Sequence, residues 1–205
     1  MRERTRTLLS IQNILWRNTG ERFSANAIKQ LPWEAVEHYL PDPHQGLAVR
    51  ASVTVLQCLQ QQIELIEQTV LAQCKPQPVF KRLKSVCGVG EILAMTIALE
   101  TGDIQRFGKV GQYASYCRCV DSRRESNGKK KGENNRKCGN EYLSWAFVEA
   151  ANFAIRHYEP VQRFYQRKKA KTNGVVAIKA VAHKLCRASY YVMRDGVEFE
   201  MTRAF

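Results

Sequence analysis

The stretch from Gln45 to Gln73 constrains the fold more than any other part of this sequence. Its seam positions are spaced alternately three and four residues apart, as in a heptad repeat, and they are Val49, Ser52, Leu56, Leu59, Ile63, Ile66 and Val70. Gln, Glu and Thr separate them, so the apolar stripe is narrower than that of a helix packed only within its own domain. We expect one long helix, and three arrangements stay open for it: a helical hairpin, an intermolecular coiled coil, or a helix of an intramolecular bundle.

The segment Lys75-Pro76-Gln77-Pro78 ends this helix and is the best domain boundary in the chain. Proline has no backbone N–H to donate, and its ring clashes with the preceding helical turn. We therefore divide the chain into a helical segment (1–44), a coiled-coil helix (45–75) and a compact C-terminal domain (76–205).

Helix signals also dominate the rest of the chain. An amphipathic pattern over Arg2–Arg17, followed by Gly20, predicts a first helix; Ser24 is placed to cap a second, and Pro32 suits the first turn of a third. After the boundary, helical patterns cover VFKRLKSV, EILAMTIALE, FGKVGQYASYCR, EYLSWAFVEAANFAIRH and EPVQRFYQRKKAK. No convincing alternating strand pattern appears, so the sequence predicts an all-α fold.

Two of the later helices have a clear inner face. Asn140 can cap the first of them, whose small-residue face suits close helix packing and consists of Leu143, Ala146, Phe147, Ala150, Ala151 and Ala154. The last long helix is expected to bury Ile178, Val181, Leu185, Ala188 and Val192. Its other side carries a stripe of Lys179, His183 and Arg187.

The charge balance points to an anionic partner. Lys and Arg number 32 against 19 Asp and Glu, which leaves a formal net charge of +13. Such an excess favours nucleic acid over a membrane surface as the partner. The longest apolar run is too short to cross a bilayer, and the N-terminus leads into no signal-peptide pattern. We expect a cytoplasmic protein that does not associate with membranes.

The cysteine pattern predicts reduced thiols and no metal site. There are 7 cysteines, an odd number in a chain with no secretory signal, which is typical of an intracellular protein. No CxxC pair occurs, and the cysteines lie mostly inside apolar patterns, so they are expected to be small buried hydrophobic residues rather than zinc ligands.

The segment from Arg123 to Asn140, RRESNGKKKGENNRKCGN, is too polar to enter a core. Its glycines allow a partner to approach the backbone closely, and its cations are Arg123, Arg124, Lys129, Lys130, Lys131, Arg136 and Lys137. An alcohol among such cations, Ser126, is suited to attack a phosphodiester, because the cations would hold the phosphate and neutralise its developing charge. No His–Asp pair is spaced from Ser126 along the sequence in a way that would indicate a protease-like triad. A solvated, disordered surface loop is the alternative.

A second feature that fits nucleic acid is the turn Gly88-Val89-Gly90 between two apolar helical patterns. Free backbone N–H groups and the positive end of a helix dipole meet at such a turn, which makes it a phosphate cradle. The spacing of Leu83, Val86, Gly88, Val89, Gly90 and Ala94 resembles a helix-hairpin-helix motif. A tight turn between two core helices is the alternative, and a dinucleotide site is excluded because no strand precedes the turn.

These pieces, in this order, resemble a known family. The run VCGVGEILAMTIALETGDIQRFGKVGQYASYCRC, then SNGKKKG, NRKCGNEYLSWAFVEAANFAI, FYQRKKAK and AIKAVAHKLCRASYYVMRDG is similar to the C-terminal serine domain of the insertion-sequence 110 family of transposases. These are bridge-RNA-guided DNA recombinases. The resemblance covers roughly the second two-thirds of the chain, and the heptad stretch is similar to the coiled-coil linker through which the family assembles.

The resemblance implies specific roles for residues of this chain. Ser126, continued by Asn127 and Gly128, matches the family's nucleophilic serine, which forms a 5′-phosphoserine intermediate with DNA; Lys137, Gly139 and Asn140 match a downstream Lys-x-Gly-Asn signature. The implied DNA-binding set is Gly88, Gly90, Arg123, Arg124, Gly128, Lys129, Lys130, Lys131, Arg136, Lys137 and Asn140.

The resemblance also implies what the chain lacks. The family's N-terminal RuvC-like domain carries a DEDD set of carboxylates for Mg²⁺, and no such segment precedes Arg2. The expectation is a transposase or recombinase fragment with no cofactor of its own, inactive in strand transfer without the nuclease domain. Its implied partners are DNA, a guide RNA and further copies of itself. The alternative function is a non-catalytic nucleic-acid-binding helical module.

Overall fold

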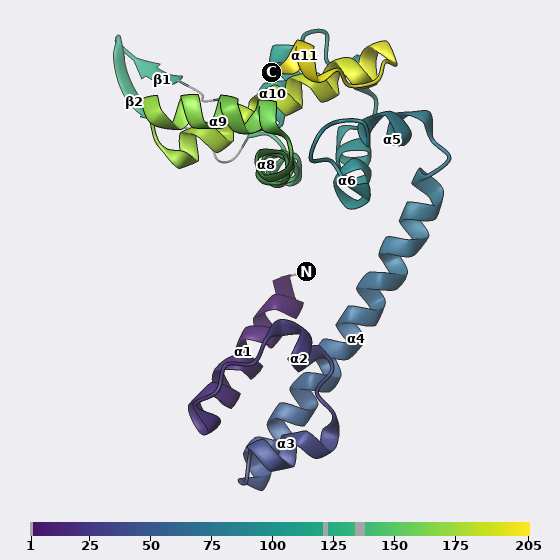
Figure 1. Ribbon diagram of the computed structural model, residues 1–205, viewed down its shortest axis with the longest axis vertical. Coiled ribbons are helices and arrows are strands. Elements are labelled where there is room, and N and C mark those ends of the chain that lie inside the picture. Colours follow the sequence, from purple (N-terminus) through teal and green to yellow (C-terminus); the bar gives the residue numbers. More distant parts are fainter. Residues whose placement is uncertain (1, 121–122, 134–137) are drawn as a thin grey trace. The chain divides into compact units, whose positions relative to one another are not determined.

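The computed structural model describes residues 2–120, 123–133 and 138–205, whereas residues 1, 121–122 and 134–137 lie outside the described part (Figure 1). The chain forms two compact units, Met1–Val70 and Leu71–Phe205. The dividing point lies near the end of a long helix, a few residues before the two prolines that were expected to mark the boundary.

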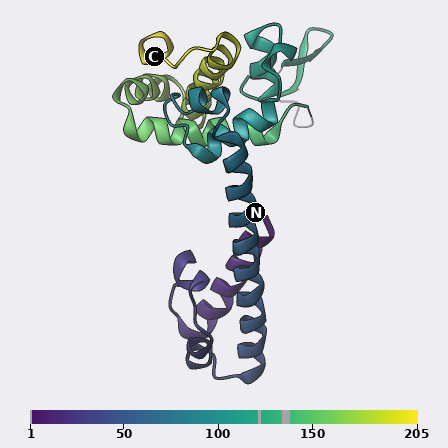
Figure 2. The same cartoon turned by 90° about the vertical axis from the view of Figure 1, so that its right-hand side faces the viewer.

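The N-terminal unit is a small helical bundle. Its helices are α1 (Arg2–Thr19), α2 (Ala25–Lys29), α3 (Trp33–Tyr39) and the first part of α4 (Pro43–Cys74). The two views show α1 lying alongside α4 (Figures 1 and 2). The side chain of Arg4 donates to Gln60 Oε1 at 3.0 Å across this pair. Ser24 caps α2 as the sequence indicates, accepting from Ala27 N at 3.1 Å.

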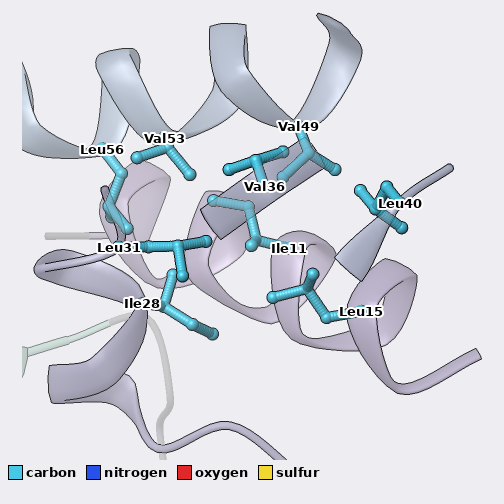
Figure 3. Packing of buried hydrophobic residues seen from close by; sticks show 9 residues of the cluster. All are labelled: Ile11, Leu15, Ile28, Leu31, Val36, Leu40, Val49, Val53 and Leu56. Carbon is cyan, nitrogen blue, oxygen red and sulfur yellow. The ribbon is translucent and has the colours of Figure 1, made fainter. Parts of the chain in front are cut away.

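The core of this unit settles how the first half of α4 packs. Figure 3 shows the fully apolar cluster, which consists of Ile11, Leu15, Ile28, Leu31, Val36, Leu40, Val49, Val53 and Leu56. Val49, Val53 and Leu56 therefore pack within the chain, as in the intramolecular-bundle alternative. Farther along the helix the seam residue Ile66 is 60% exposed and Leu59 and Ile63 are half-buried, so the second half of the heptad seam is not covered by the core of this unit.

The C-terminal unit is built around one central helix. Its helical elements are α5 (Pro78–Leu83), α6 (Glu91–Thr101), the 3-10 helix η1 (Ile104–Arg106), α7 (Val110–Tyr116), α8 (Glu141–His157), α9 (Glu159–Lys171), α10 (Gly174–Asp195) and α11 (Met201–Ala204). Helix α10 contacts α5, α7, α8, α9, α11 and η1. Its buried face extends from Ala177 to Met193, while cationic residues occupy its other side.

The inner faces of α8 and α10 follow the sequence pattern closely. All six expected residues of α8 are buried: Leu143, Ala146, Phe147, Ala150, Ala151 and Ala154. Of the five expected on α10, Val181, Leu185 and Val192 are buried, while Ile178 and Ala188 are half-buried. The four alanines of α8 let neighbouring backbones approach closely, and Gly88 packs against α8 at two of them, Ala150 and Ala154.

The fold is helical as predicted, with one exception in the described residues. The first part of the polar segment forms an antiparallel hairpin of β1 (Arg123–Ser126) and β2 (Lys129–Glu133). The absence of a strand pattern in the sequence did not exclude it, because a hairpin that lies away from the core has no apolar face to reveal it. The signal was the dipeptide Asn127-Gly128, which strongly favours a two-residue hairpin turn.

The seven thiols are all free. Cys74, Cys87, Cys117 and Cys186 are buried, whereas Cys58 and Cys138 are exposed. Burial raises the pKa of Cys87 to about 12, so that thiol is neutral at physiological pH and acts as a small apolar residue.

No described helix combines the length and the apolar character that crossing a bilayer requires. Among the same residues, no group of three or more His, Cys, Asp or Glu side chains is placed to hold a metal ion.

Candidate nucleic-acid interface

The hairpin of β1 and β2 projects from the helices of its unit as a narrow arm (Figure 1). Its turn consists of Asn127 and Gly128, with φ of 54° and 68°. Positive φ at both turn residues is the geometry whose twist matches that of the two strands. In the register of the hairpin Ser126 is opposite Lys129 and Glu125 is opposite Lys130, so the predicted nucleophile lies at the last strand position before the turn.

The strands change register once, between Arg124 and Glu125. Such an irregularity bends a strand and increases its twist. Asn127, Gly128 and Lys129 at the tip are exposed. The tip therefore presents backbone and at least one ammonium group to solvent, next to the predicted nucleophile.

Several of the predicted site residues cannot be placed as side chains. The backbone of the strands is described, but the side chains of Arg123, Arg124, Ser126, Lys130 and Lys131 fall outside the described part of the chain, as do Arg136 and Lys137 altogether. Their assignment to DNA binding or catalysis stays a prediction that rests on sequence.

Arg118 fixes the base of the arm to the helical body. Its guanidinium donates from Nε to Cys138 O at 2.9 Å and from Nη2 to Gly139 O at 3.0 Å, which ties the chain leaving α7 to the chain entering α8. Arg118 itself has φ of 53°, a left-handed conformation that is uncommon for a non-glycine residue. Sequence reasoning did not single out this residue, and no pattern marks it, because its partners lie about 20 residues away.

Gly139 allows the two segments at the base of the arm to come together. Its φ is +83°, and a Cβ atom there would lie 2.6 Å from Tyr116 O. Only glycine tolerates both the conformation and the approach. The glycine of the Lys-x-Gly-Asn signature thus has a structural role at the base of the arm.

Asn140 combines two tasks at the N-terminus of α8. Its Oδ1 accepts from Tyr142 N at 2.8 Å and from Leu143 N at 3.0 Å, which confirms the predicted helix cap. Its Nδ2 donates to Glu100 Oε2 at 2.6 Å and approaches Tyr116 Oη at 3.5 Å. The side chain is therefore fully used inside the protein, and its predicted contact with DNA has no support from this geometry.

An aromatic and cationic cluster lies beside this network. The Arg106 guanidinium lies 4.6 Å from the ring centre of Phe107 and 4.7 Å from that of Tyr116. Hydrogen bonds from Asn140 and then Arg106 lower the pKa of the Tyr116 hydroxyl. Arg106 is exposed, so the cluster adds a positive, flat surface close to the base of the arm. No sequence pattern indicates this cluster, because Arg106 and Phe107 meet Tyr116 only through the packing of η1 and α7.

The glycine turn connects α5 to α6, and its two glycines differ. Gly88 has φ of +80°; a Cβ there would overlap Ala150 O and lie 3.0 Å from Ala154 N, so the turn packs directly on the α8 backbone. Gly90 is exposed, has open space around it, and is the N-cap of α6. Gly90 remains free to present backbone to a phosphate, whereas Gly88 faces the protein. The helix-hairpin-helix assignment stays a prediction.

Comparisons with known proteins bear on the same part of the chain. Residues 80–166 match the family model described as Transposase IS116/IS110/IS902 family. A Pseudomonas aeruginosa protein named "Probable family 20 transposase" is 28% identical over 117 residues, which are 57% of this chain and 34% of that protein. A Streptomyces coelicolor protein named "Insertion element IS110 uncharacterized 43.6 kDa protein" is 26% identical over 157 residues, covering 75% of this chain and 38% of that protein.

The match to these curated relatives therefore spans just over a third of their length. The matched family segment includes the glycine turn, the arm, all of α8 and the three residues at the base of the arm, Arg118, Gly139 and Asn140. The geometry described above and the similarity thus fall on the same residues.

Proposed function

We propose that this chain is a transposase segment of the IS116/IS110/IS902 type, which binds DNA and contributes the serine nucleophile of strand transfer. The observation that carries the proposal is the arm: Ser126 is the last residue of β1, beside an exposed turn and opposite Lys129. The family match over residues 80–166 supports it independently, because the arm lies inside the matched segment.

The chemistry of the proposed step is a transesterification at phosphorus. The Ser126 oxygen attacks a backbone phosphorus; the bond from that phosphorus to the 3′-oxygen of the preceding nucleotide breaks, and the serine proton ends on that 3′-oxygen. The number of phosphodiester bonds does not change. The new bond between the serine oxygen and phosphorus can later be attacked by a 3′-hydroxyl, which rejoins the DNA. Cations near the phosphate would stabilise the charge that spreads over its oxygens.

Contacts at the base of the arm fix the positions of the two ends of the segment that forms it. Arg118, Gly139 and Asn140 hold both ends of the segment against α7 and α8. A nucleophile must approach phosphorus in line with the leaving oxygen, and positioning of this kind accounts for much of phosphoryl-transfer catalysis. In this proposal the three residues position the arm and do not touch the DNA.

DNA binding by the chain should depend strongly on salt. If about six phosphates are neutralised, log K against log[salt] should have a slope of about −5. Lys129→Gln, at the exposed tip, should weaken binding equally on unrelated sequences and reduce the magnitude of the slope by about 1. Fluorescence anisotropy of labelled duplexes between 50 and 200 mM salt, roughly the range over which such losses are largest, measures both quantities.

Arg22→Gln is the matched control, since Arg22 is an exposed cation of the N-terminal unit. It should leave the slope unchanged. A binding constant that does not vary with salt would contradict the proposal that the chain binds a nucleic-acid backbone. An equal effect of Lys129→Gln and Arg22→Gln would show that the arm is not part of the interface. The same measurement with single-stranded RNA tests the second proposed partner, a guide RNA.

We also propose that the chain self-associates through the second half of α4. Leu59 and Ile63 are half-buried there and Ile66 is 60% exposed, so the seam has an apolar surface to offer a second copy. Leu59→Asp with Ile66→Asp should abolish association, because two carboxylates would be buried at the seam. Sedimentation velocity measures the result.

The control for this assembly is Gln62→Asp with Gln68→Asp, which adds the same charge at two exposed positions of the same helix. This variant should keep the oligomeric state of the wild type. A wild-type chain that sediments as a monomer at all concentrations would end the assembly proposal without affecting the proposal for Ser126.

A further inference from the structure

A cavity of about 730 Å³ lies between α9, α10 and the C-terminal segment 196–205 of the second unit. Its size is within the range of small-molecule sites. None of the described residues of the arm lines it, and we treat it as a site apart from the proposed strand-transfer site. Two residues of the polar stripe on α10, His183 and Arg187, form part of its wall.

Along the wall formed by α10, the lining side chains change from cationic to aromatic to acidic. His183, Arg187, Tyr191 and Asp195 are spaced four residues apart and all line the cavity. At a rise of 1.5 Å per residue, Arg187 and Asp195 are about 12 Å apart along the helix axis, with Tyr191 between them. The wall thus runs from cationic through aromatic to acidic.

The cationic end has two side chains available for an anion. Lys168 of α9 and Arg187 both line the cavity, and no ion pair involves either of them in the described part of the chain. Lys184 is engaged elsewhere: it donates to Ala204 O at 2.6 Å and its ammonium lies 4.9 Å from the Phe164 ring centre. Burial, followed by the nearby Arg187 and Lys184, lowers the pKa of His183, so its imidazole is neutral at pH 7.

The acidic end has one carboxylate available for a hydrogen-bond donor. Arg194 binds Asp195 through two nitrogens, at 2.7 and 3.1 Å. Arg203 binds Glu200 at 2.8 Å. Glu198 lines the cavity as well and is exposed, and no ion pair to it occurs among the described residues.

The C-terminal segment is held in place as the second wall. The backbone N–H of Phe199 donates to Ser85 Oγ at 2.9 Å. Phe164 and Phe205 pack edge to face, with ring centres 5.7 Å apart. These contacts fix the segment at its middle and at its end, so the cavity has a formed shape before any ligand enters.

We propose that this cavity binds a nucleotide, with its phosphate on Lys168 and Arg187, its base beside Tyr191, and the donor edge of the base on Glu198. A nucleotide carries an anion, a flat ring and N–H donors in one molecule, and the lining of the cavity offers a partner for each of them. Guanine fits best, because it presents two adjacent N–H donors to one carboxylate. The nucleotide can be free or belong to a strand.

Isothermal titration of the whole chain with guanosine 5′-monophosphate, guanosine and inorganic phosphate tests the site. Arg187→Gln should weaken the nucleotide about tenfold by removing a charge-assisted hydrogen bond. Glu198→Gln should weaken the nucleotide while leaving inorganic phosphate unchanged. Thymidine 5′-monophosphate should bind less tightly than the guanine nucleotide.

Lys179→Gln is the control, because Lys179 is an exposed cation of the same helix that does not line the cavity; it should have no effect. A 5′-phosphorylated hexanucleotide that begins with guanosine distinguishes the sources: tighter binding than the mononucleotide assigns the site to a strand, and weaker binding to a free nucleotide. Absence of binding by both, or equal effects of Arg187→Gln and Lys179→Gln, would overturn the proposal. Ser126→Ala should not alter nucleotide binding. Failure of the nucleotide-site proposal is therefore distinguishable from failure of the strand-transfer proposal.

Discussion

Ser126→Ala is expected to abolish the covalent protein–DNA adduct completely while leaving DNA binding within about twofold of the wild type, the scale of a surface substitution. The change removes the attacking oxygen and keeps the strand position that Ser126 occupies at the end of β1. Loss of a nucleophile eliminates the reaction pathway, whereas the cations that are proposed to bind phosphate remain. The expected difference between binding and chemistry is the largest that any single substitution in this chain should produce.

The adduct is best measured with a nicked suicide duplex labelled at the 3′ end of the cleaved strand. The proposed step leaves the protein on the 5′-phosphate, so the 3′ label should migrate with the 23.5 kDa chain in a denaturing gel. Because the chain matches only about a third of its relatives, the assay includes Mg²⁺ and a full-length relative whose own aligned serine is replaced by alanine.

Ser115→Ala is the control for this experiment, since Ser115 is an exposed serine on α7 of the same unit. It should form the adduct at the wild-type rate. An adduct that persists in Ser126→Ala would show that another residue is the nucleophile. If neither chain forms one while an intact relative does, the non-catalytic binding module becomes the better description.

Gly88→Ala is expected to destabilise the C-terminal unit by about 3 kcal/mol or more. A non-glycine residue in the left-handed region costs about 1–3 kcal/mol, and forcing extra volume into a packed contact costs about 1–3 kcal/mol more. Both apply here, because φ is +80° and the new Cβ would overlap Ala150 O. The atom it meets is backbone of α8, which cannot move aside as the end of a flexible side chain can.

Thermal unfolding followed by circular dichroism measures the effect, with an expected fall of roughly 10 °C in the midpoint of the C-terminal unit. Gly90→Ala is the matched control two residues away, where φ is −85° and no atom lies within 4 Å of the new Cβ. It should cost no more than about 1 kcal/mol, the scale of a weakened helix cap. An unchanged midpoint for Gly88→Ala would mean that the turn does not pack on α8.

The two glycine variants also separate stability from DNA binding. Sequence reasoning gave both glycines the same task, as parts of a phosphate cradle. The geometry distinguishes the two, because Gly88 packs closely on α8 whereas Gly90 has open space around it. If Gly90→Ala weakens DNA binding without unfolding the chain, the cradle prediction gains support for this position.

The helices could be predicted because their determinants are local. Asn140 caps α8 as expected, and the six buried residues of α8 are those that the spacing selects. The helix predicted over EPVQRFYQRKKAK is α9, with the same bounds, Glu159–Lys171. Caps act within one turn and apolar periodicity repeats every 3.6 residues, so both are visible in a short window of sequence.

The arm and its base could not be predicted in the same way. A polar hairpin has no apolar alternation, so only the Asn127-Gly128 turn indicated it. The partners of Arg118 and Asn140 lie 20 to 40 residues away in the sequence. Such distant pairs are brought together only when α6, α7 and α8 have packed.

The sequence by itself determined the helical class, the ends of most helices and the net positive charge, which favours an anionic partner. Tertiary structure alone decided which half of α4 is already occupied, why Gly88 must be glycine, and that the wall of α10 presents a cation, an aromatic ring and an acid to one cavity. The physical reason is range: local preferences are encoded within a few residues, whereas close approaches and cavities arise only when distant segments share the same space.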